Sequence, residues 1–305
     1  MAADVLKQNT GARRLLLSVR PLGTGQIASR LGLGTHSLHR LLLPSARRRL
    51  LAAAYDLGIR YFDTAPSYGA GLAEREIGQV LSKRRSELIL ATKFGIAPGR
   101  LATVVPAGAY LTATAGAALK LIRLKDTGRN VPRRDYSTAT MRQSVEGSLR
   151  RLRTDYIDVL YLHAPVVDCP VEADQLASAL EALRTAGKIR YAGLSGDVGN
   201  CLAIARGCPD LAEVLQLEVP ADPQGAPSAA PLPPEVSIGF WEFPAPFPGQ
   251  PERPLAQTLD QLHRAVPSGM ILLSTRNLTV IEEATKQLRG AERASGSSPA
   301  PESSS

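Results

Sequence analysis

The sequence predicts an α/β protein in which eight parallel strands close into a barrel inside a ring of helices. Short apolar runs alternate with segments of helical period, which is the pattern of a parallel sheet with crossover helices. Eight strand candidates follow one another from residue 30 onward, and an eightfold repeat of this kind closes naturally. A length of 305 residues suits one core of this size.

The repeating unit is clearest in the first half of the chain. After the strand candidate at 30–34, a helix is expected over 45–58, with Ser45 as its N-cap and Gly58 at its end. The strand IRYF follows at 59–62. The same unit, a helix followed by a strand, recurs five times. The helices are expected at 72–84, 139–152, 172–188, 200–207 and 254–266, and the strands that follow them at 88–92, 156–162, 189–194, 212–219 and 270–274. A further strand is expected in 236–243 and a last helix over 280–288.

One helix shows its expected buried face directly. Met141, Val145, Leu149 and Leu152 recur at helical spacing, so they fall on one side, as burial against a sheet requires. The sixth strand has no such helix after it. It runs into PADPQGAPSAAPLPPE at 220–235, where proline and glycine forbid a regular helix.

The domain organisation expected is an N-terminal extension over 1–21, a barrel over 22–289 and a low-complexity, disordered tail over 290–305. Residues 97–137 form an insertion after the third strand. Three interpretations of it remain open: a packed extra helix with a solvated loop, a lid over the active site, or a helix lying on a membrane surface, for which large apolar anchors are few.

An open, doubly wound sheet is the competing fold. That fold carries a G-x-G-x-x-G fingerprint between a strand and a helix. The stretch LGTGQIASRLGLG has the glycines without the spacing. The closed (β/α)8 barrel, or TIM barrel, is therefore the prediction.

Charge and cysteine content narrow the classes of function. The net charge is +8, but the basic residues are scattered along helices and aromatic residues make up only 5% of the chain, so nucleic-acid binding is not expected. Cys169, Cys201 and Cys208 form no C-x-x-C pair, which argues against disulfides or zinc and favours a cytoplasmic location. The apolar run near 13–23 is too short for a signal peptide, an Arg-rich transit peptide being the weaker alternative.

Polar residues stand where the predicted strands end, which is the edge at which such barrels place catalytic groups. These are Asp63, Lys93, His163, Ser195 and Ser274 at the ends of the second, third, fourth, fifth and eighth strands, with Tyr68 in the loop just past Asp63. An ordinary scatter of polar residues would rarely place an Asp, a Lys and a His on three successive strand ends beside a Tyr.

Several stretches together resemble the aldo-keto reductase family. They are GIRYFDTAPSYGAGLAEREIGQVL, LATKFG, YIDVLYLHAP, IRYAGLSG and STRNLTVIEEATKQL. The resemblance runs in order through residues 22–289, except in the insertion and from 219 to 254, and DTAPSYGAGLAE is most similar to the aldose dehydrogenase branch. It implies an oxidoreductase that interconverts a carbonyl and an alcohol in an eightfold barrel, with a tetrad of Asp63, Tyr68, Lys93 and His163 and a bound NADP(H) or NAD(H).

The chemistry of the four residues can be argued independently. A free tyrosine has a pKa near 10 and needs a stabilised phenolate to exchange protons at neutral pH. We expect the ammonium of Lys93, held by Asp63, to lower the pKa of Tyr68. His163 is expected to hydrogen-bond the substrate carbonyl. Taken singly, Asp63 could cap a turn, Lys93 and His163 could be structural, and Tyr68 could be plain packing.

The resemblance also implies a set of cofactor contacts. They are Gly34, Thr35, Asp63, Ser195 and Gln216 at the nicotinamide and ribose end, and Ser274, Thr275, Arg276 and Glu283 at the adenosine phosphate and adenine end. The helix start after the eighth strand suits a phosphate. Arg276 favours NADP(H) over NAD(H), because a guanidinium suits a terminal phosphate; a plain surface arginine is its alternative role.

Some positions depart from the family pattern. Gly196 and Ala284 stand where the family commonly has asparagine, and no tyrosine is evident on the seventh strand, where Phe240 or Trp241 could stack on the nicotinamide instead. These losses motivate a second hypothesis, a non-catalytic nucleotide-binding barrel that reports redox state. Membrane contact through 104–134 is a weaker one. His36 and His39 lack a third metal ligand, so we expect no metal site and place His36 at the substrate mouth.

Overall fold

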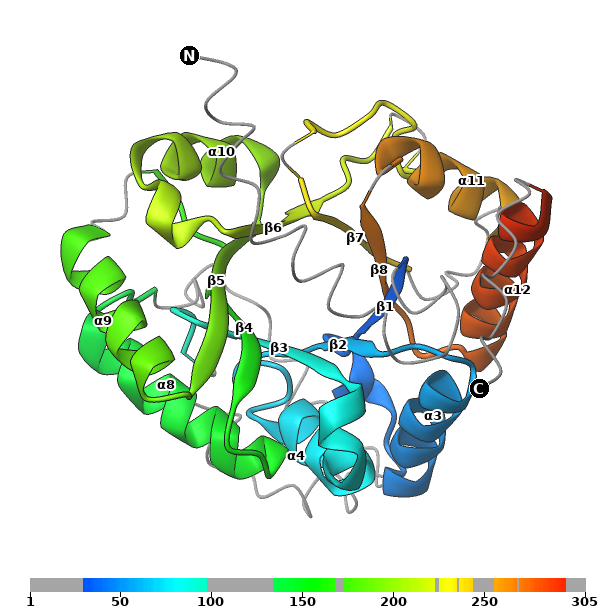
Figure 1. Ribbon diagram of the computed structural model, residues 1–305. Coiled ribbons are helices and arrows are strands. Elements are labelled where there is room, and N and C mark those ends of the chain that lie inside the picture. Colours follow the sequence, from blue (N-terminus) through cyan, green and yellow to red (C-terminus); the bar gives the residue numbers. More distant parts are fainter. Residues whose placement is uncertain are drawn as a thin grey trace, which may run out of the picture.

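The computed structural model describes residues 30–97, 134–167, 173–222, 225–234, 236–243, 255–267 and 269–294. Across these residues, eight parallel strands close into a barrel in sequence order, and helices surround it (Figure 1). The predicted (β/α)8 TIM barrel is confirmed. Because all strands run the same way, every strand ends at the same rim of the barrel.

The bounds of the elements are as follows. The strands are β1 (Leu31–Gly34), β2 (Tyr61–Asp63), β3 (Ile89–Phe94), β4 (Ile157–His163), β5 (Ile189–Gly196), β6 (Val214–Glu218), β7 (Ile238–Glu242) and β8 (Met270–Ser274). The helices are α3 (Pro44–Asp56), α4 (Leu72–Leu81), α8 (Thr138–Leu152), α9 (Ala173–Thr185), α10 (Val198–Gly207), α11 (Leu255–Ala265) and α12 (Leu278–Ala294), with short 3-10 turns η3 (Leu38–Arg40), η4 (Ser82–Glu87) and η5 (Pro209–Leu211).

Alternation along the strands produces two apolar layers. Side chains on one face of each strand fill the barrel interior, and those on the other face pack beneath the helices. The interior layer is Tyr61, Ile89, Ala91, Val159, Tyr161, Val214, Ile238, Met270 and Leu272. Phe240 packs against this interior layer, whereas Trp241 packs against the outer one.

Helix ends follow local chemistry, with one correction. The expected apolar face of α8 is buried at Met141, Val145, Leu149 and Leu152. Ser45 does not cap α3, which instead begins with Pro44 in its first turn after an extended Leu43. Proline suits that position because its missing N–H would have no helical partner there. Gly58 lies just past the helix with φ 98°, as predicted for its end.

The irregular segments agree with the sequence in part. The described residues between β6 and β7 contain no helix, as their prolines predicted. The helix α12 continues to Ala294, past residue 290, where the sequence predicted the tail to begin. Residues 1–21, most of the 97–137 insertion and 295–305 lie outside the described residues. Within the described ranges, no helix is long and apolar enough to cross a membrane.

Candidate active site

The centre of the rim is a buried ion pair between neighbouring strands. Lys93 Nζ lies 2.5 Å from each carboxylate oxygen of Asp63 and 3.1 Å from the carbonyl oxygen of Thr64. All three ammonium hydrogens therefore have acceptors. Both side chains are almost inaccessible, at 1% and 4% exposed. Burial lowers the pKa of Lys93 and raises that of Asp63, and the close pairing opposes both shifts.

The loop that carries Tyr68 is built on left-handed backbone. Gly69, Ala70 and Gly71 follow the tyrosine with φ of 59°, 54° and 79°. A Cβ on Gly69 would meet the Cβ of His39 at 2.6 Å, so the glycine there is required by space as well as by φ. The turn reverses the chain directly into α4 and fixes Tyr68 over the ion pair.

Tyr68 is buried beside two imidazoles and a cation. Its ring makes edge contacts with His36 and His163, at centroid distances of 5.0 and 5.7 Å, and lies 5.1 Å from Lys93 Nζ. Among the described residues, its hydroxyl has no hydrogen-bond partner. The tetrad predicted from sequence is thus brought together around one side chain.

The expected acidification of Tyr68 is wrong for this arrangement. Burial raises the pKa of Tyr68 well above 10, and the negative charges of Asp63 and Glu242 raise it further. Lys93 does not reverse this in the resting site, because Asp63 offsets part of its charge at contact distance. The phenol is therefore held protonated.

His163, at the end of β4, is held neutral. Its pKa lies well below 6.5 because of burial first, then because of the positive charges of Lys93, His36 and Arg134. A neutral imidazole keeps one N–H donor and one acceptor nitrogen. His163 and Tyr68 therefore present two neutral donors at the rim.

A polar floor supports the ion pair from below. The Gln216 amide nitrogen donates to Asp63 Oδ1 at 3.2 Å and to Ser195 Oγ at 3.1 Å, and its oxygen accepts from the Tyr61 hydroxyl at 3.2 Å. The Tyr61 hydroxyl also lies 2.9 Å from that of Tyr161. The amide of Gln216, predicted as a cofactor contact, is thus engaged by protein groups and is 1% exposed.

Sequence reasoning missed Tyr136 and Arg134, which brace the end of β4. The Tyr136 hydroxyl donates to the carbonyl oxygens of His163 and Ala164 at 2.8 and 3.1 Å, and Arg134 Nε donates to the same Ala164 oxygen at 3.2 Å. Both residues end the 97–137 insertion. The only available signal was their place just before the helix that leads into β4, the strand that ends at His163.

A second missed group is the network around Glu74 on α4. Its carboxylate is fully buried and accepts from Thr92 Oγ1 at 2.9 Å and from Arg151 Nε at 2.5 Å. Thr92 is next to Lys93 on β3, and the negative charge of Glu74 raises the pKa of Lys93. A Cβ on Gly71 would collide with the Arg151 side chain at 2.6 Å, so glycine opens the path for this arginine.

The predicted phosphate end of the site lies between β8 and α12. Ser274 Oγ is buried and has no hydrogen-bond partner among the described residues. Thr275 Oγ1 accepts from the backbone N–H of Asn277 at 3.1 Å. Arg276, half-buried, lies near enough to His39 to lower its pKa. An orphaned hydroxyl, a guanidinium and a helix start form a set that fits an anionic group.

The other predicted cofactor residues have mixed surroundings. Gly34 pairs with Ser274, and a Cβ there would crowd the serine Cβ at 3.3 Å. The Thr35 hydroxyl donates to the carbonyl oxygen of Asp63 at 2.9 Å. Glu283 is exposed on α12, 3.7 Å from Lys286. Of these three, only Gly34 and Thr35 lie at the rim beside the tetrad.

The end of β7 carries a carboxylate that sequence reasoning did not single out. Glu242 Oε2 lies 3.1 Å from Nδ1 of His36 across the mouth of the barrel. His36 therefore lines the mouth, as predicted. No group of three potential metal ligands occurs within the described ranges.

Comparison with known proteins identifies the family. The model of the aldo/keto reductase family matches residues 30–201. The chain is 33% identical over 227 residues to D-threo-aldose 1-dehydrogenase from a Pseudomonas species, covering 70% of this chain and 63% of that protein. The chain belongs to the aldo/keto reductase family.

One further curated relative and one solved structure are also similar to the chain. L-galactose dehydrogenase from Arabidopsis thaliana is 31% identical over 188 residues, which cover 59% of this chain and 49% of that protein. A holo-form aldo-keto reductase structure from Bacillus halodurans superposes with a TM-score of 0.59 at 22% identity, covering 89% of this chain and 88% of that one. The chain thus spans about half to two thirds of the curated relatives' lengths, and the structural likeness shows the fold.

Proposed function

We propose that this protein is a nicotinamide-dependent oxidoreductase that interconverts a carbonyl and an alcohol. The observation that carries the proposal is the buried Lys93–Asp63 pair beneath Tyr68, with His163 alongside. Perturbed groups gathered at the carboxyl ends of barrel strands are typical of active sites.

Tyr68 is the general acid in the reductive direction. Its raised pKa keeps the proton on the phenol until a carbonyl oxygen gains charge and accepts it. The nicotinamide, when bound, supplies or receives the hydride. The neutral His163 donates a hydrogen bond that orients the carbonyl beside Tyr68.

Lys93 acts on Tyr68 through its electrostatic field. Its three hydrogens are already bonded, so it stabilises the phenolate left after proton transfer from 5.1 Å below the ring. Asp63 and Gln216 hold the ammonium in place. In the oxidative direction the step reverses: the Tyr68 phenolate, stabilised by the same field, accepts the hydroxyl proton of the alcohol.

The relatives support a class of substrate, and residues at the end of β8 support a class of cofactor. The relatives named as aldose and galactose dehydrogenases support an aldehyde, ketone or aldose. The unpartnered Ser274 hydroxyl and Arg276 support a dinucleotide phosphate between β8 and α12, and Arg276 favours NADP(H), with NAD(H) as the alternative. The cytoplasm remains the expected location on cysteine content.

The proposal is tested by steady-state assays of purified protein on aldehydes, ketones and aldoses with both dinucleotides. Wild type should turn over at least one of them, and Lys93→Met should lose about a hundredfold or more in kcat. Equal, slow turnover by both proteins would contradict the proposal. Tight NADPH binding with no turnover on the whole panel would instead favour a nucleotide-responsive regulatory protein.

A further inference from the structure

The strand order places Glu242 under the path of the proposed cofactor. Glu242 ends β7, which lies between β6 and β8, and it pairs in register with Ser274. A dinucleotide held with its nicotinamide beside Tyr68 and its phosphates at Ser274 would lie near Glu242, because Glu242 contacts His36 and the His36 ring lies 5.0 Å from that of Tyr68. This step rests on the proposed function.

The carboxylate of Glu242 is directed to the mouth of the barrel. Phe240, two residues earlier on the same strand, packs in the barrel interior, and alternation gives Glu242 the same side. Its oxygen reaches His36 just past β1. Its charge raises the pKa values of both Tyr68 and Glu218, so its field extends across the site.

A carboxylate at this place distinguishes the two states of a nicotinamide. The oxidised ring carries a positive charge, whereas the reduced ring is neutral. We propose that Glu242 makes this site bind the oxidised dinucleotide in preference to the reduced one. By linkage, the bound reduced cofactor becomes a stronger hydride donor by the same factor. Since Glu242 is 41% exposed, solvent screens the effect to about three- to tenfold.

His36 moderates this preference. Its imidazole shares the carboxylate through the 3.1 Å contact, which withdraws negative charge from Glu242. Loss of His36 should therefore increase the preference for the oxidised form, while loss of the Glu242 charge should remove it. If the Glu242–His36 pair were purely structural, the two substitutions would not change the preference for the oxidised dinucleotide in opposite directions.

The test is isothermal titration calorimetry of the full-length protein with NADP+ and with NADPH, repeated with NAD+ and NADH. The quantity compared is the ratio of the two dissociation constants. Glu242→Gln should weaken binding of the oxidised form about three- to tenfold and leave the reduced form within about twofold. His36→Gln should shift the ratio the other way. Asp260→Asn, an exposed carboxylate on α11 paired with Arg264, is the matched control and should change neither.

An unchanged ratio in Glu242→Gln overturns the inference, as does equal weakening of both forms. Circular dichroism of each variant confirms that it is folded. If the wild-type protein binds neither form of either dinucleotide, the proposed function itself fails and this inference fails with it. If Glu242→Gln binds both forms with the same ratio of dissociation constants as wild type, this inference fails while the proposed function stands.

Discussion

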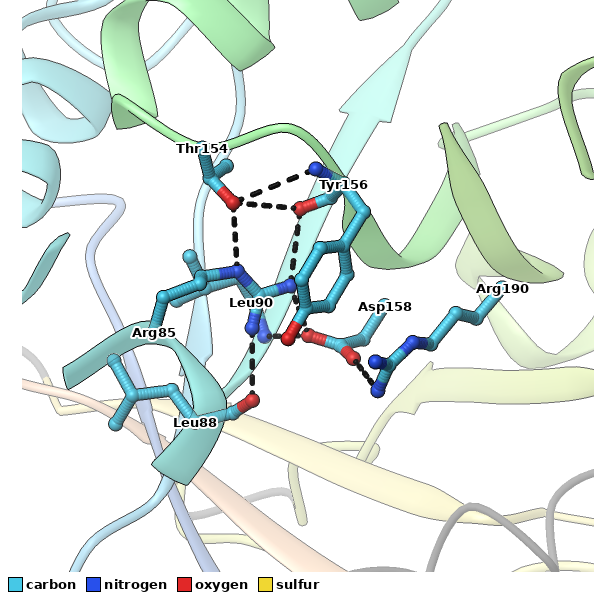
Figure 2. A network of polar contacts seen from close by, with 7 residues as sticks. All are labelled: Arg85, Leu88, Leu90, Thr154, Tyr156, Asp158 and Arg190. Atoms are coloured by element: carbon cyan, nitrogen blue, oxygen red, sulfur yellow. Dashed lines mark hydrogen bonds and ion pairs between the residues drawn. The ribbon is translucent and has the colours of Figure 1, made fainter. Parts of the chain in front are cut away.

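The two rims of the barrel each bury a carboxylate beside cations, yet they use it differently. At the carboxyl rim, Asp63 holds Lys93 beneath Tyr68. Near the amino rim, Asp158 of β4 is 1% exposed and accepts from Arg85 at 2.6 Å, from Arg190 at 2.9 Å and from the Leu90 backbone N–H at 2.9 Å (Figure 2).

The amino-rim network is a closed set of contacts. Arg85 also donates to Thr154 Oγ1 at 2.9 Å and to the Tyr156 carbonyl at 3.0 Å. The guanidinium carbon of Arg85 lies 3.7 Å from the centroid of the Tyr156 ring, and that of Arg190 lies 4.2 Å from the same centroid. These contacts join η4, β3, β4 and β5, so they fix the strands together.

The carboxyl rim leaves groups without partners. The hydroxyls of Ser274 and Thr64 are buried without hydrogen bonds among the described residues, and the Tyr68 hydroxyl is also free there. Arginine, which is always charged, pairs with the buried carboxylate of the amino rim, whereas lysine, whose pKa is lowered by burial, pairs with the buried carboxylate of the carboxyl rim. At the carboxyl rim these hydroxyls lie beside the buried ion pair or at the end of β8, whereas Asp158 at the amino rim accepts from three donors.

The largest effect is expected when one substitution at each rim is compared for stability and for activity. Lys93→Met leaves the buried Asp63 without a cation and should lower the free energy of unfolding by about 3–5 kcal/mol, whereas Arg85→Met leaves Asp158 paired with Arg190 and should lower it by less. Only Lys93→Met should also lower kcat by about a hundredfold or more once corrected for folded protein. Urea unfolding and steady-state kinetics measure the two quantities. A comparable fall in the corrected kcat of Arg85→Met would break the comparison.

The next effect is a pH dependence of stability that belongs to His163. Its pKa is lowered well below 6.5 by burial and by Lys93, His36 and Arg134, so below pH 6.5 the unfolded chain binds a proton that the folded chain does not. Stability is therefore lost as pH falls. At pH 5 the loss from this residue is at most about 2 kcal/mol, the limit that an unfolded-state pKa near 6.5 sets.

His163→Gln should remove that loss. Urea unfolding at pH 7 and pH 5 should show a smaller difference for the variant than for wild type. His263→Gln serves as control, because its pKa is lowered in a partly exposed place on α11, and it should change the difference less. An identical pH dependence in His163→Gln and wild type would contradict this assignment.

A smaller effect is expected at Glu74, which links the carboxyl rim to α8. Glu74→Gln removes the charge that raises the pKa of Lys93, so kcat should fall about tenfold and its alkaline limb should move to lower pH. Glu76, on the same helix, is buried and accepts from Arg47 and Arg48 at 3.0 and 2.9 Å. Glu76→Gln should lower stability and leave the pH profile of kcat unchanged. Matching profiles for the two variants would refute the link.

The smallest effect concerns one hydroxyl near each rim. Ser274 and Ser237 are buried to a similar degree, 6% and 5% exposed, but Ser237 accepts from the Leu215 N–H, whereas Ser274 has no partner among the described residues. Ser237→Ala should cost about 1 kcal/mol of stability. Ser274→Ala should cost little stability and weaken dinucleotide binding about fivefold. If Ser274→Ala binds the dinucleotide as tightly as wild type does, the serine is not part of the dinucleotide site.

The sequence by itself determined the barrel and the membership of the tetrad. Apolar alternation and helical period specify which residues face a sheet, and strand ends in a parallel barrel share one rim, so Asp63, Lys93 and His163 had to meet there. These features depend on neighbours in sequence and on a repeating topology.

Only the tertiary structure decided the charge states and the supporting contacts. The high pKa of Tyr68 comes first from burial and then from the negative charges of Asp63 and of Glu242 on β7. The bonds of Gln216 and Glu74 join residues far apart in the chain. Distances of a few ångströms between distant segments set electrostatic energies, because Coulomb interactions in a buried site change steeply with separation and with exposure to water, and no local pattern of residues encodes either quantity.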